Sequence, residues 1–173
     1  MGKKINLIPG LILCLSLLLL VSGCSAPGKD KEVVAFDSLF EKVKLSDLEN
    51  KTISMEQYRG QTVFLNIWAT WCKPCLAEMP SIQKAKDILQ DKEVVFLLAS
   101  GESIQEINSF RKANNYQFNY TRIENSEELN IQGLPTTFIF DAKGQLVFTE
   151  MGSRKWDTKD NIDMILKIAA KNE

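Results

Sequence analysis

Two kinds of hydrophobic pattern alternate along the middle of the chain. Thr62 to Trp68 and Glu93 to Ser100 are short, almost continuously apolar runs, which is typical of strands buried inside a sheet. Each run is followed by a longer segment of helical character, Cys72 to Gln90 and Ser103 to about Asn114. The second of these segments begins with a capping box, Ser-Ile-Gln-Glu. This alternation predicts parallel strands joined by helices.

The last third of the chain has the pattern of a hairpin followed by a helix. Thr136 to Phe140 and Gln145 to Glu150 flank the turn sequence Asp-Ala-Lys-Gly, which predicts two antiparallel strands. Asp157 is expected to cap a final helix that ends near Lys171. The hairpin therefore adds antiparallel edge strands to a parallel sheet.

Four weaker segments complete the pattern. Val43 to Leu45 and Thr52 to Ser54 predict an N-terminal hairpin, Phe118 to Ile123 a short strand, and Ser126 to Asn130 a short helix. The sequence therefore predicts an α/β fold with a central mixed β-sheet flanked by helices on both faces and an added N-terminal β-hairpin.

The N-terminus has the pattern of a secretory signal. Lys3 and Lys4 precede an apolar stretch from Leu11 to Val21, and small residues follow it. A transmembrane anchor is the weaker interpretation, because the run is short and Pro9 and Gly10 interrupt its start.

The segment Val21-Ser22-Gly23-Cys24 resembles the lipobox of bacterial lipoproteins. The resemblance implies that Cys24 is acylated on its sulfur after cleavage just before it, with ordinary cleavage or an uncleaved anchor as alternatives. We expect residues 1–23 to be a lipoprotein signal peptide, residues 24–36 the acylated cysteine and a flexible tether, and residues 37–173 the folded domain. That domain would then lie in the cell envelope, on the extracytoplasmic side of a membrane.

Composition excludes several classes of function. The 173 residues are 45% hydrophobic and 25% charged, which is ordinary for one globular domain. The net charge of −1 predicts no nucleic-acid partner. The chain has no histidine, so it lacks the commonest general base and the commonest metal ligand.

Only two of the four cysteines are expected to be free in the mature domain. Cleavage would remove Cys14 and acylation would consume Cys24, which leaves Cys72 and Cys75. Two thiols without histidine cannot complete a four-ligand zinc site. Covalent haem attachment needs a histidine after the second cysteine, where this chain has Leu76. We therefore expect no metal and no cofactor other than a disulfide between the two cysteines.

The sequence Trp71-Cys72-Lys73-Pro74-Cys75 carries the candidate chemistry. It lies between a predicted strand and a predicted helix, so both thiols fall on the first helical turn. A disulfide across so small a loop stabilises a fold by about 2 kcal/mol, against roughly 3 kcal/mol for a loop of about 15 residues. The pair is therefore better suited to exchanging a disulfide with another protein than to bracing the fold.

A family resemblance supports this interpretation. Phe64 to Cys75, Glu78 to Pro80 and Gly133 to Phe138 resemble thioredoxin-fold proteins, and most closely the TlpA/ResA-like branch of membrane-tethered thiol–disulfide oxidoreductases. The resemblance covers roughly Val43 to Lys171 and implies a thioredoxin fold. Asn66 stands where thioredoxins have a buried aspartate, and the TlpA-like branch also lacks that aspartate. Any internal proton acceptor must therefore lie elsewhere.

A peroxiredoxin is a less suitable match. Its motif needs a proline seven residues before the reactive cysteine and a threonine or serine three residues before it. This chain has Leu65 and Ala69 at those positions relative to Cys72. We therefore do not expect peroxidase activity.

The resemblance implies roles for three residues of the reaction centre. Cys72 would be the partly exposed nucleophile at the helix N-terminus, and Cys75 the buried resolving thiol. Glu78, three residues further along the helix, would influence the pKa values of the cysteines and relay a proton if it is buried. The alternative for Glu78 is a solvated helix carboxylate.

The resemblance also implies a supporting shell. Pro135 would be a cis-proline beside Cys72, Leu134 would offer its backbone to an extended client peptide, and Thr136 would support this strand. By the same resemblance, Pro74 would tune the redox potential. From their positions beside Cys72, we also expect Lys73 to add a weak, screened positive charge and Trp71 to form an apolar rim for clients. Trp68 is expected in the core, Glu102 is a weaker candidate for the site, and Trp156 receives no role.

We therefore expect a lipid-anchored, extracytoplasmic thiol–disulfide oxidoreductase. The resemblance implies a reductase of protein disulfides, such as those of apocytochrome c, that receives electrons from a membrane transporter of the DsbD or CcdA type. Two alternatives remain open at this point: a binding module with the thioredoxin fold and an idle disulfide, and a net oxidant that differs only in redox potential.

Overall fold

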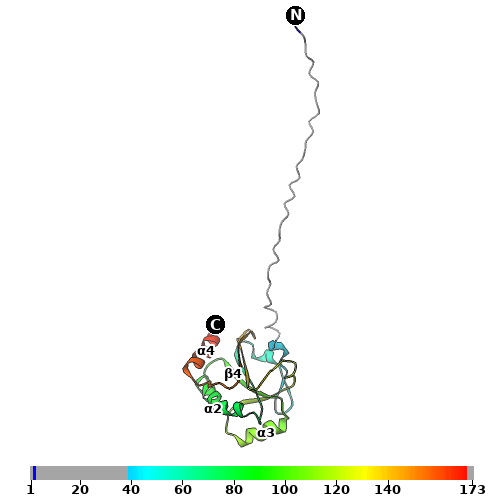
Figure 1. Ribbon diagram of the computed structural model, residues 1–173, viewed down its shortest axis with the longest axis vertical. Coiled ribbons are helices and arrows are strands. Elements are labelled where there is room, and N and C mark those ends of the chain that lie inside the picture. Colours follow the sequence, from blue (N-terminus) through cyan, green and yellow to red (C-terminus); the bar gives the residue numbers. More distant parts are fainter. Residues whose placement is uncertain (1, 3–38, 171–173) are drawn as a thin grey trace. The chain divides into compact units, whose positions relative to one another are not determined.

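A central mixed sheet organises the computed structural model, which describes residue 2 and residues 39–170 (Figure 1). Within the described part, seven strands pair in the order β2-β1-β5-β4-β3-β6-β7. The strands are β1 Leu45–Ser46, β2 Thr52–Ile53, β3 Thr62–Trp68, β4 Val94–Ser100, β5 Asn119–Ile123, β6 Thr136–Phe140 and β7 Leu146–Met151. The helical elements are the 3-10 helix η1 Met55–Tyr58 and the α-helices α2 Lys73–Ile88, α3 Ile104–Ala113 and α4 Lys159–Ala169. Apart from residue 2, the predicted signal peptide lies outside the described residues, as do Cys24 and the predicted tether.

Strand pairing confirms the predicted mixture of parallel and antiparallel strands. β3 pairs in parallel with β4 and antiparallel with β6, and β4 pairs in parallel with β5. β7 pairs antiparallel with β6 at one edge. At the other edge β1 and β2 form the predicted N-terminal hairpin, with Leu45 opposite Ile53.

The three α-helices share one face of the sheet. Their buried side chains form one cluster with Phe64 and Trp68 of β3. The chain steps from β3 to β4 to β5 in one direction, so two right-handed crossovers place α2 and α3 on the same side. The opposite face packs against Phe40 of the helical residues 39–42 and against Met55 of η1. The second face is therefore flanked only by short helical segments among the described residues, where the sequence suggested a fuller cover.

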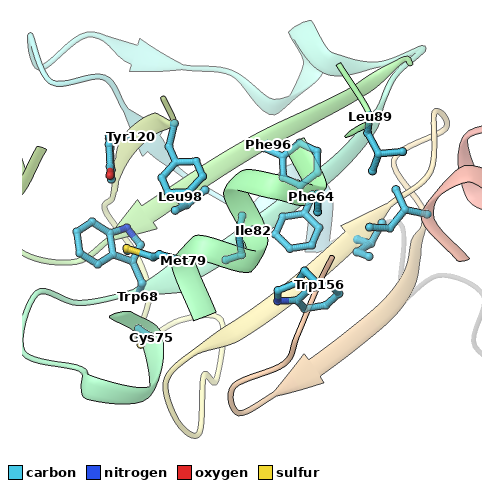
Figure 2. Close-up of a cluster of buried hydrophobic side chains, with 14 of the residues drawn as sticks. Phe64, Trp68, Cys75, Met79, Ile82, Leu89, Phe96, Leu98, Tyr120 and Trp156 are labelled. Carbon is cyan, nitrogen blue, oxygen red and sulfur yellow. The ribbon is translucent and has the colours of Figure 1, made fainter. Parts of the chain in front are cut away.

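The α2 helix is fixed by its buried side, which determines where its first turn lies. Met79 and Ile82 of this helix pack into the cluster with Phe64 and Trp68 (Figure 2). Replacing a fully buried aliphatic side chain such as Ile82 by alanine typically costs 2–5 kcal/mol, so this contact holds α2 firmly on the sheet. The start of α2 is thereby fixed at the end of β3.

Two local predictions are wrong. Ser126 to Asn130 forms consecutive turns instead of a helix, and Asn130 has a positive φ of 51°. Five residues cannot repay the cost of helix nucleation without support from packing. The final helix is capped by Thr158, whose side chain accepts a hydrogen bond from Asn161 N. The predicted cap, Asp157, instead pairs with Lys84, with 3.6 Å between Asp157 Oδ2 and Lys84 Nζ.

No helix in the described part of the chain is both long enough and apolar enough to cross a membrane.

Candidate active site

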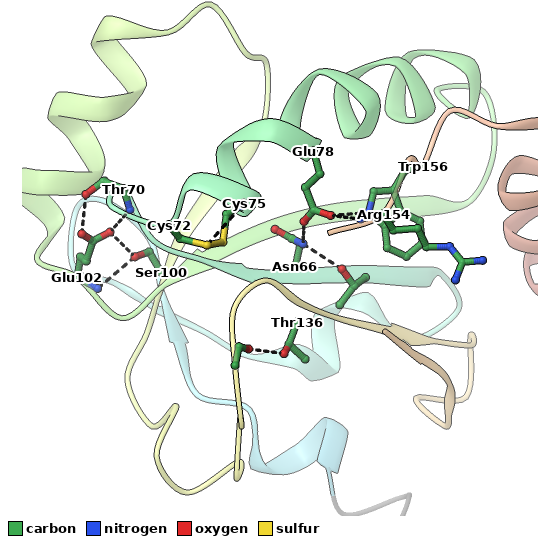
Figure 3. Close-up of a disulfide and its surroundings, with 12 residues drawn as sticks. Asn66, Thr70, Cys72, Cys75, Glu78, Ser100, Glu102, Thr136, Arg154 and Trp156 are labelled. Carbon is green, nitrogen blue, oxygen red and sulfur yellow. Dashed lines mark hydrogen bonds between the residues drawn. A yellow bond between two sulfur atoms is a disulfide. The ribbon is translucent and has the colours of Figure 1, made fainter. Parts of the chain in front are cut away.

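The two cysteines of the motif form a disulfide at the junction of β3 and α2 (Figure 3). Cys72 is the N-cap of α2, and its sulfur accepts a hydrogen bond from the main-chain N–H of Cys75 at 3.3 Å. The Cα atoms of the two residues are 5.3 Å apart. Pro74 occupies the first turn of the helix, where its missing N–H costs no hydrogen bond.

An open cleft of about 770 Å³ gives access to the motif. Trp71, Cys72, Lys73, Pro74 and Leu134 all contribute to its lining. Trp71 is 71% exposed, as expected of a rim residue, whereas Cys72 is only 4% exposed and Cys75 1%. The expected contrast between an exposed and a buried cysteine is therefore small in the disulfide form, and the two sulfurs differ mainly in that Cys72 lines the cleft.

The loop before β6 has the predicted conformation. The peptide bond between Leu134 and Pro135 is cis. Pro135 is buried, and its carbonyl oxygen accepts a hydrogen bond from Gly152 N at 2.8 Å. The Thr136 hydroxyl group donates to Gly133 O at 2.7 Å. These bonds hold Leu134 at the wall of the cleft that contains Cys72.

Glu78 is buried behind the disulfide and is only 2% exposed. Its Oε1 accepts a hydrogen bond from Asn66 Nδ2 at 2.8 Å, and its Oε2 accepts from Arg154 N at 3.0 Å and Trp156 Nε1 at 3.2 Å (Figure 3). Burial raises the pKa of this carboxyl group, and the three hydrogen bonds lower it by a smaller amount. Glu78 is therefore not the solvated carboxylate of the alternative interpretation.

Asn66 connects this carboxyl group to the sheet. Its side-chain amide also donates to Thr137 Oγ1 at 2.9 Å, across the β3–β6 pair. An amide at this position provides a donor to Glu78 but cannot take up a proton. Of these two residues, only Glu78 can therefore gain or lose a proton.

Two residues of this environment were missed by the sequence reasoning. Arg154 and Trp156 follow β7 and lie more than 70 residues from Glu78 in sequence. Neither belongs to a motif, and the segment that carries them is a loop. The one sequence signal for this loop is the tryptophan itself, because a large apolar residue just before a predicted helix suggests that the loop turns into the core.

Glu102 lies beside the motif and was the weaker candidate. Its carboxylate accepts hydrogen bonds from Thr70 N at 2.7 Å, Thr70 Oγ1 at 2.6 Å and Ser100 Oγ at 3.0 Å. It also contributes to the lining of the cleft. Glu102 therefore ties the loop before Cys72 to the end of β4.

The geometry supports chemistry at sulfur. The N-terminus of α2 stabilises a negative charge at the N-cap by about 0.3–1 kcal/mol, and at most ~2 kcal/mol. The Cys75 N–H adds a direct donor to the Cys72 sulfur. When the disulfide is reduced, a thiolate at Cys72 can attack a disulfide in the cleft, and Cys75 is placed to attack Cys72 in turn. No cluster of three or more potential metal-ligating side chains occurs among residues 2 and 39–170.

Comparison with known proteins gives the same picture. A model described as the AhpC/TSA family matches residues 38–149. The thiol-disulfide oxidoreductase ResA of Geobacillus thermodenitrificans is 35% identical over 141 residues, which cover 79% of this chain and 81% of that protein.

Solved structures share the fold. A thiol:disulfide interchange protein of the thioredoxin family from Chlorobium tepidum superimposes with a TM-score of 0.60 at 23% identity, covering 73% of this chain and 92% of the other. The exposed lipoprotein thioredoxin of Streptococcus pneumoniae has a TM-score of 0.56 at 28% identity, covering 72% of this chain and 96% of its own.

Proposed function

Because the chain belongs to the AhpC/TSA family and is a thiol–disulfide oxidoreductase related to ResA, we propose that it reduces disulfides of extracytoplasmic proteins through Cys72 and Cys75. The observation that carries this proposal is the position of the Cys72–Cys75 disulfide, at the N-terminus of a helix and at the wall of an open cleft. A disulfide with a purely structural role would need neither a helix N-terminus nor an open cleft.

The proposed reaction starts from the dithiol form. The Cys72 thiolate attacks one sulfur of a client disulfide, and the other client sulfur leaves as a thiolate that takes up a proton. Cys75 then loses its proton and attacks the Cys72 sulfur, which forms the Cys72–Cys75 disulfide and releases the second client sulfur as a thiolate that also takes up a proton. Two electrons and two protons pass to the client, and no cofactor beyond this pair is used.

Glu78 has a proposed part in the second step. It lies one helical turn after Cys75 and is sheltered from water, so its carboxylate can accept the proton that Cys75 must lose. Trp71, Lys73, Pro74 and Leu134 would form the surface on which the client lies, and the buried residues Pro135 and Thr136 would support it.

The direction of the reaction rests on the family resemblance. The TlpA/ResA-like branch usually keeps extracytoplasmic thiols reduced, notably those of apocytochrome c before haem attachment, with electrons from a DsbD- or CcdA-type transporter. We propose the same client class and donor type here. A reduction potential of the Cys72–Cys75 pair near −270 mV, the value for thioredoxin, would support a reductant, and one near −120 mV, the value for DsbA, an oxidant.

A lipid anchor at Cys24 is proposed from the lipobox-like sequence Val21 to Cys24. The similarity to a protein described as an exposed lipoprotein in Streptococcus pneumoniae supports this. In bacteria that express the full chain, labelled palmitate should be incorporated into the wild-type protein and not into Cys24→Ser. Equal labelling of both would reject the anchor, as would no labelling of either.

Mixed-disulfide trapping tests the proposed function. With the full chain carrying Cys75→Ser, the second step is blocked, so client proteins should stay linked to Cys72 until a reducing agent is added. The double variant Cys72→Ser, Cys75→Ser is the control. Wild-type protein should also catalyse insulin reduction. If nothing is trapped and insulin is not reduced, the disulfide is idle and a binding module is the better description.

A further inference from the structure

A buried tryptophan outside the motif contacts the ionisable group of the site. Trp156 is fully buried, and its indole Nε1 donates a hydrogen bond to Glu78 Oε2 at 3.2 Å. Figure 3 shows the carboxyl group of Glu78 between Asn66 on one side and the Arg154–Trp156 segment on the other. The indole therefore lies on the far side of Glu78 from the sheet strand that holds Asn66.

The indole is held in this orientation from several directions. The backbone N–H of Trp156 donates a hydrogen bond to Ser81 Oγ at 3.1 Å, which ties Trp156 to α2. Its ring packs edge-on against Phe64, with ring centroids 4.7 Å apart, and the Arg154 guanidinium lies 5.5 Å from the ring centroid. A ring fixed in this way cannot turn its N–H toward another acceptor.

We infer that Trp156 is a positioning residue for thiol–disulfide exchange: its indole N–H holds the Glu78 carboxyl group one turn from Cys75 and favours the ionised form of that group. The inference deepens the proposed function, because it rests on Glu78 as the proton acceptor of Cys75. A hydrogen bond to a charged acceptor is stronger than one to a neutral acceptor, so a fixed donor favours the carboxylate.

Among the described residues, no charged side chain donates a hydrogen bond to Glu78 in place of the Trp156 indole. Glu150 lies near enough to raise the pKa of Glu78 further, and its carboxylate is paired with the Arg154 guanidinium, which also donates to Asn161. Where α2 meets the start of the last helix, Lys84 pairs with Asp157. Among the described residues, the donors to Glu78 are thus neutral: Asn66, the Arg154 backbone and Trp156.

Trp156→Phe removes the indole N–H and retains an aromatic ring. We expect the pKa of Glu78 to rise by about one to two units in this variant, as follows from the loss of one hydrogen bond to a charged group. The pKa is measured by carbon-13 NMR of glutamate carboxyl carbons in the full chain in detergent, with Glu78→Gln to assign the signal. The disulfide form is used, because its cysteines do not titrate and no client is needed.

Trp68→Phe is the matched control. Trp68 is also a buried indole of the same core cluster, and its Nε1 has no hydrogen-bond partner among the described residues. We expect no change in the pKa of Glu78 in this variant. An unchanged pKa in Trp156→Phe would overturn the inference, and so would equal shifts in both variants, because these would reflect loosened packing.

A wild-type measurement avoids any dependence on the folding of a variant. The indole N–H resonance of Trp156 should shift with pH at the pKa of Glu78, and this shift should be absent in Glu78→Gln. An indole resonance that ignores the titration of Glu78 would contradict the contact.

The link to the reaction is tested separately. If Glu78 accepts the Cys75 proton, the acidic limb of the pH profile for insulin reduction should move to higher pH in Trp156→Phe, by the same amount as the pKa of Glu78. A profile that stays in place while that pKa moves overturns the positioning role. Failure of the proposed function looks different, since wild-type protein would then reduce no insulin at any pH.

Discussion

Glu78 brings together two opposing effects at the residue scale. Removal from water favours the neutral acid, and three fixed donors favour the carboxylate. Because burial is the larger effect, the pKa of Glu78 lies above its ordinary value of 4.5. A group in this situation can change its protonation state at a pH where an exposed glutamate stays ionised.

The raised pKa predicts how stability depends on pH. The folded protein binds the Glu78 proton more tightly than the unfolded chain, so its contribution to stability is fully present below about pH 4.5. The contribution is lost as the pH rises through the pKa of the folded state, with a slope of at most about 1.4 kcal/mol per pH unit. Urea unfolding of the disulfide form across this range should show the unfolding free energy of the wild type falling relative to that of Glu78→Gln as the pH rises.

Glu127→Gln is the control for this measurement, because it removes an exposed carboxyl group on the cleft wall. Its curve should follow that of the wild type. If Glu78→Gln also follows the wild type, then Glu78 does not titrate differently in the folded and unfolded chains.

Trp71 gives a second prediction at this scale. A large aromatic side chain that is 71% exposed and adjacent to Cys72 offers apolar contact to a client. Trp71→Ala should lower kcat/KM for insulin reduction by about tenfold, the equivalent of 1.4 kcal/mol of client contact. Exchange with a small-molecule disulfide should be unaffected, because such a reagent does not cover the rim.

Ile88→Ala serves as the control for Trp71. Ile88 is also an exposed hydrophobic residue, at the opposite end of α2 from the disulfide. A loss of insulin reduction in Ile88→Ala, or an equal loss toward the small disulfide in Trp71→Ala, would argue against a client rim.

Individual residues could be placed from the sequence where a local pattern identified them. The cysteine pair, Glu78 and the cis-proline were predicted because each belongs to a motif. Trp156 could not be placed, because its contact with Glu78 depends on how the chain returns to the sheet after β7. Local sequence carries no record of such a long-range contact.

At the scale of elements, the continuous apolar runs predicted β3 and β4 to within one residue. The capping box predicted the start of α3, and both of its reciprocal hydrogen bonds are present. The helix predicted from Ser126 to Asn130 is wrong because turn-forming residues can have the pattern of a short helix, and no local signal distinguishes a turn from a helix here. The shared face of α2 and α3 required the strand order, which alternation alone does not supply.

Glu102 carries the prediction at this scale, because it joins two elements. Its bonds to Thr70 fasten the loop between β3 and α2 to the end of β4. Glu102→Ala leaves the Thr70 donors without their acceptor, so the unfolding free energy should fall by about 1–3 kcal/mol. Hydrogen exchange at the Thr70 amide should also become faster, while exchange in the middle of β3 should be unchanged apart from the global loss.

Glu127→Ala is the matched control for Glu102. It removes the same charge from the same cleft, and no described hydrogen bond joins Glu127 to Thr70. If both variants speed exchange at the Thr70 amide equally, the charge of the cleft matters and the bonds from Glu102 do not.

At the scale of the whole molecule, folding and redox chemistry are linked. If the disulfide raises the unfolding free energy, then folding must favour the disulfide over the dithiol by the same free energy. A chain that is more stable when oxidised is therefore a better reductant than its own unfolded chain. A chain that is more stable when reduced is an oxidant, as in DsbA, whose reduced form is stabilised.

Three effects decide the sign here. Closing the short Cys72–Cys75 loop favours the oxidised form by about 2 kcal/mol. The N-terminus of α2 stabilises a Cys72 thiolate, and hence the reduced form, by at most ~2 kcal/mol. The loop contribution is at least as large as that of the helix N-terminus, so the balance favours the disulfide. Where Glu78 is ionised, its negative charge behind the thiols opposes a thiolate and favours the disulfide further.

The oxidised full chain should therefore have a higher unfolding free energy than the reduced chain at neutral pH, by up to about 2 kcal/mol. Urea unfolding of both forms measures this difference, and about 1.4 kcal/mol corresponds to 30 mV in the potential of the pair. At a pH where Glu78 is ionised, the difference in unfolding free energy should be smaller in Glu78→Gln, because the opposing charge is gone, whereas Glu127→Gln should preserve it. A reduced form that is more stable than the oxidised form would identify the protein as an oxidant and reverse the proposed direction of electron flow.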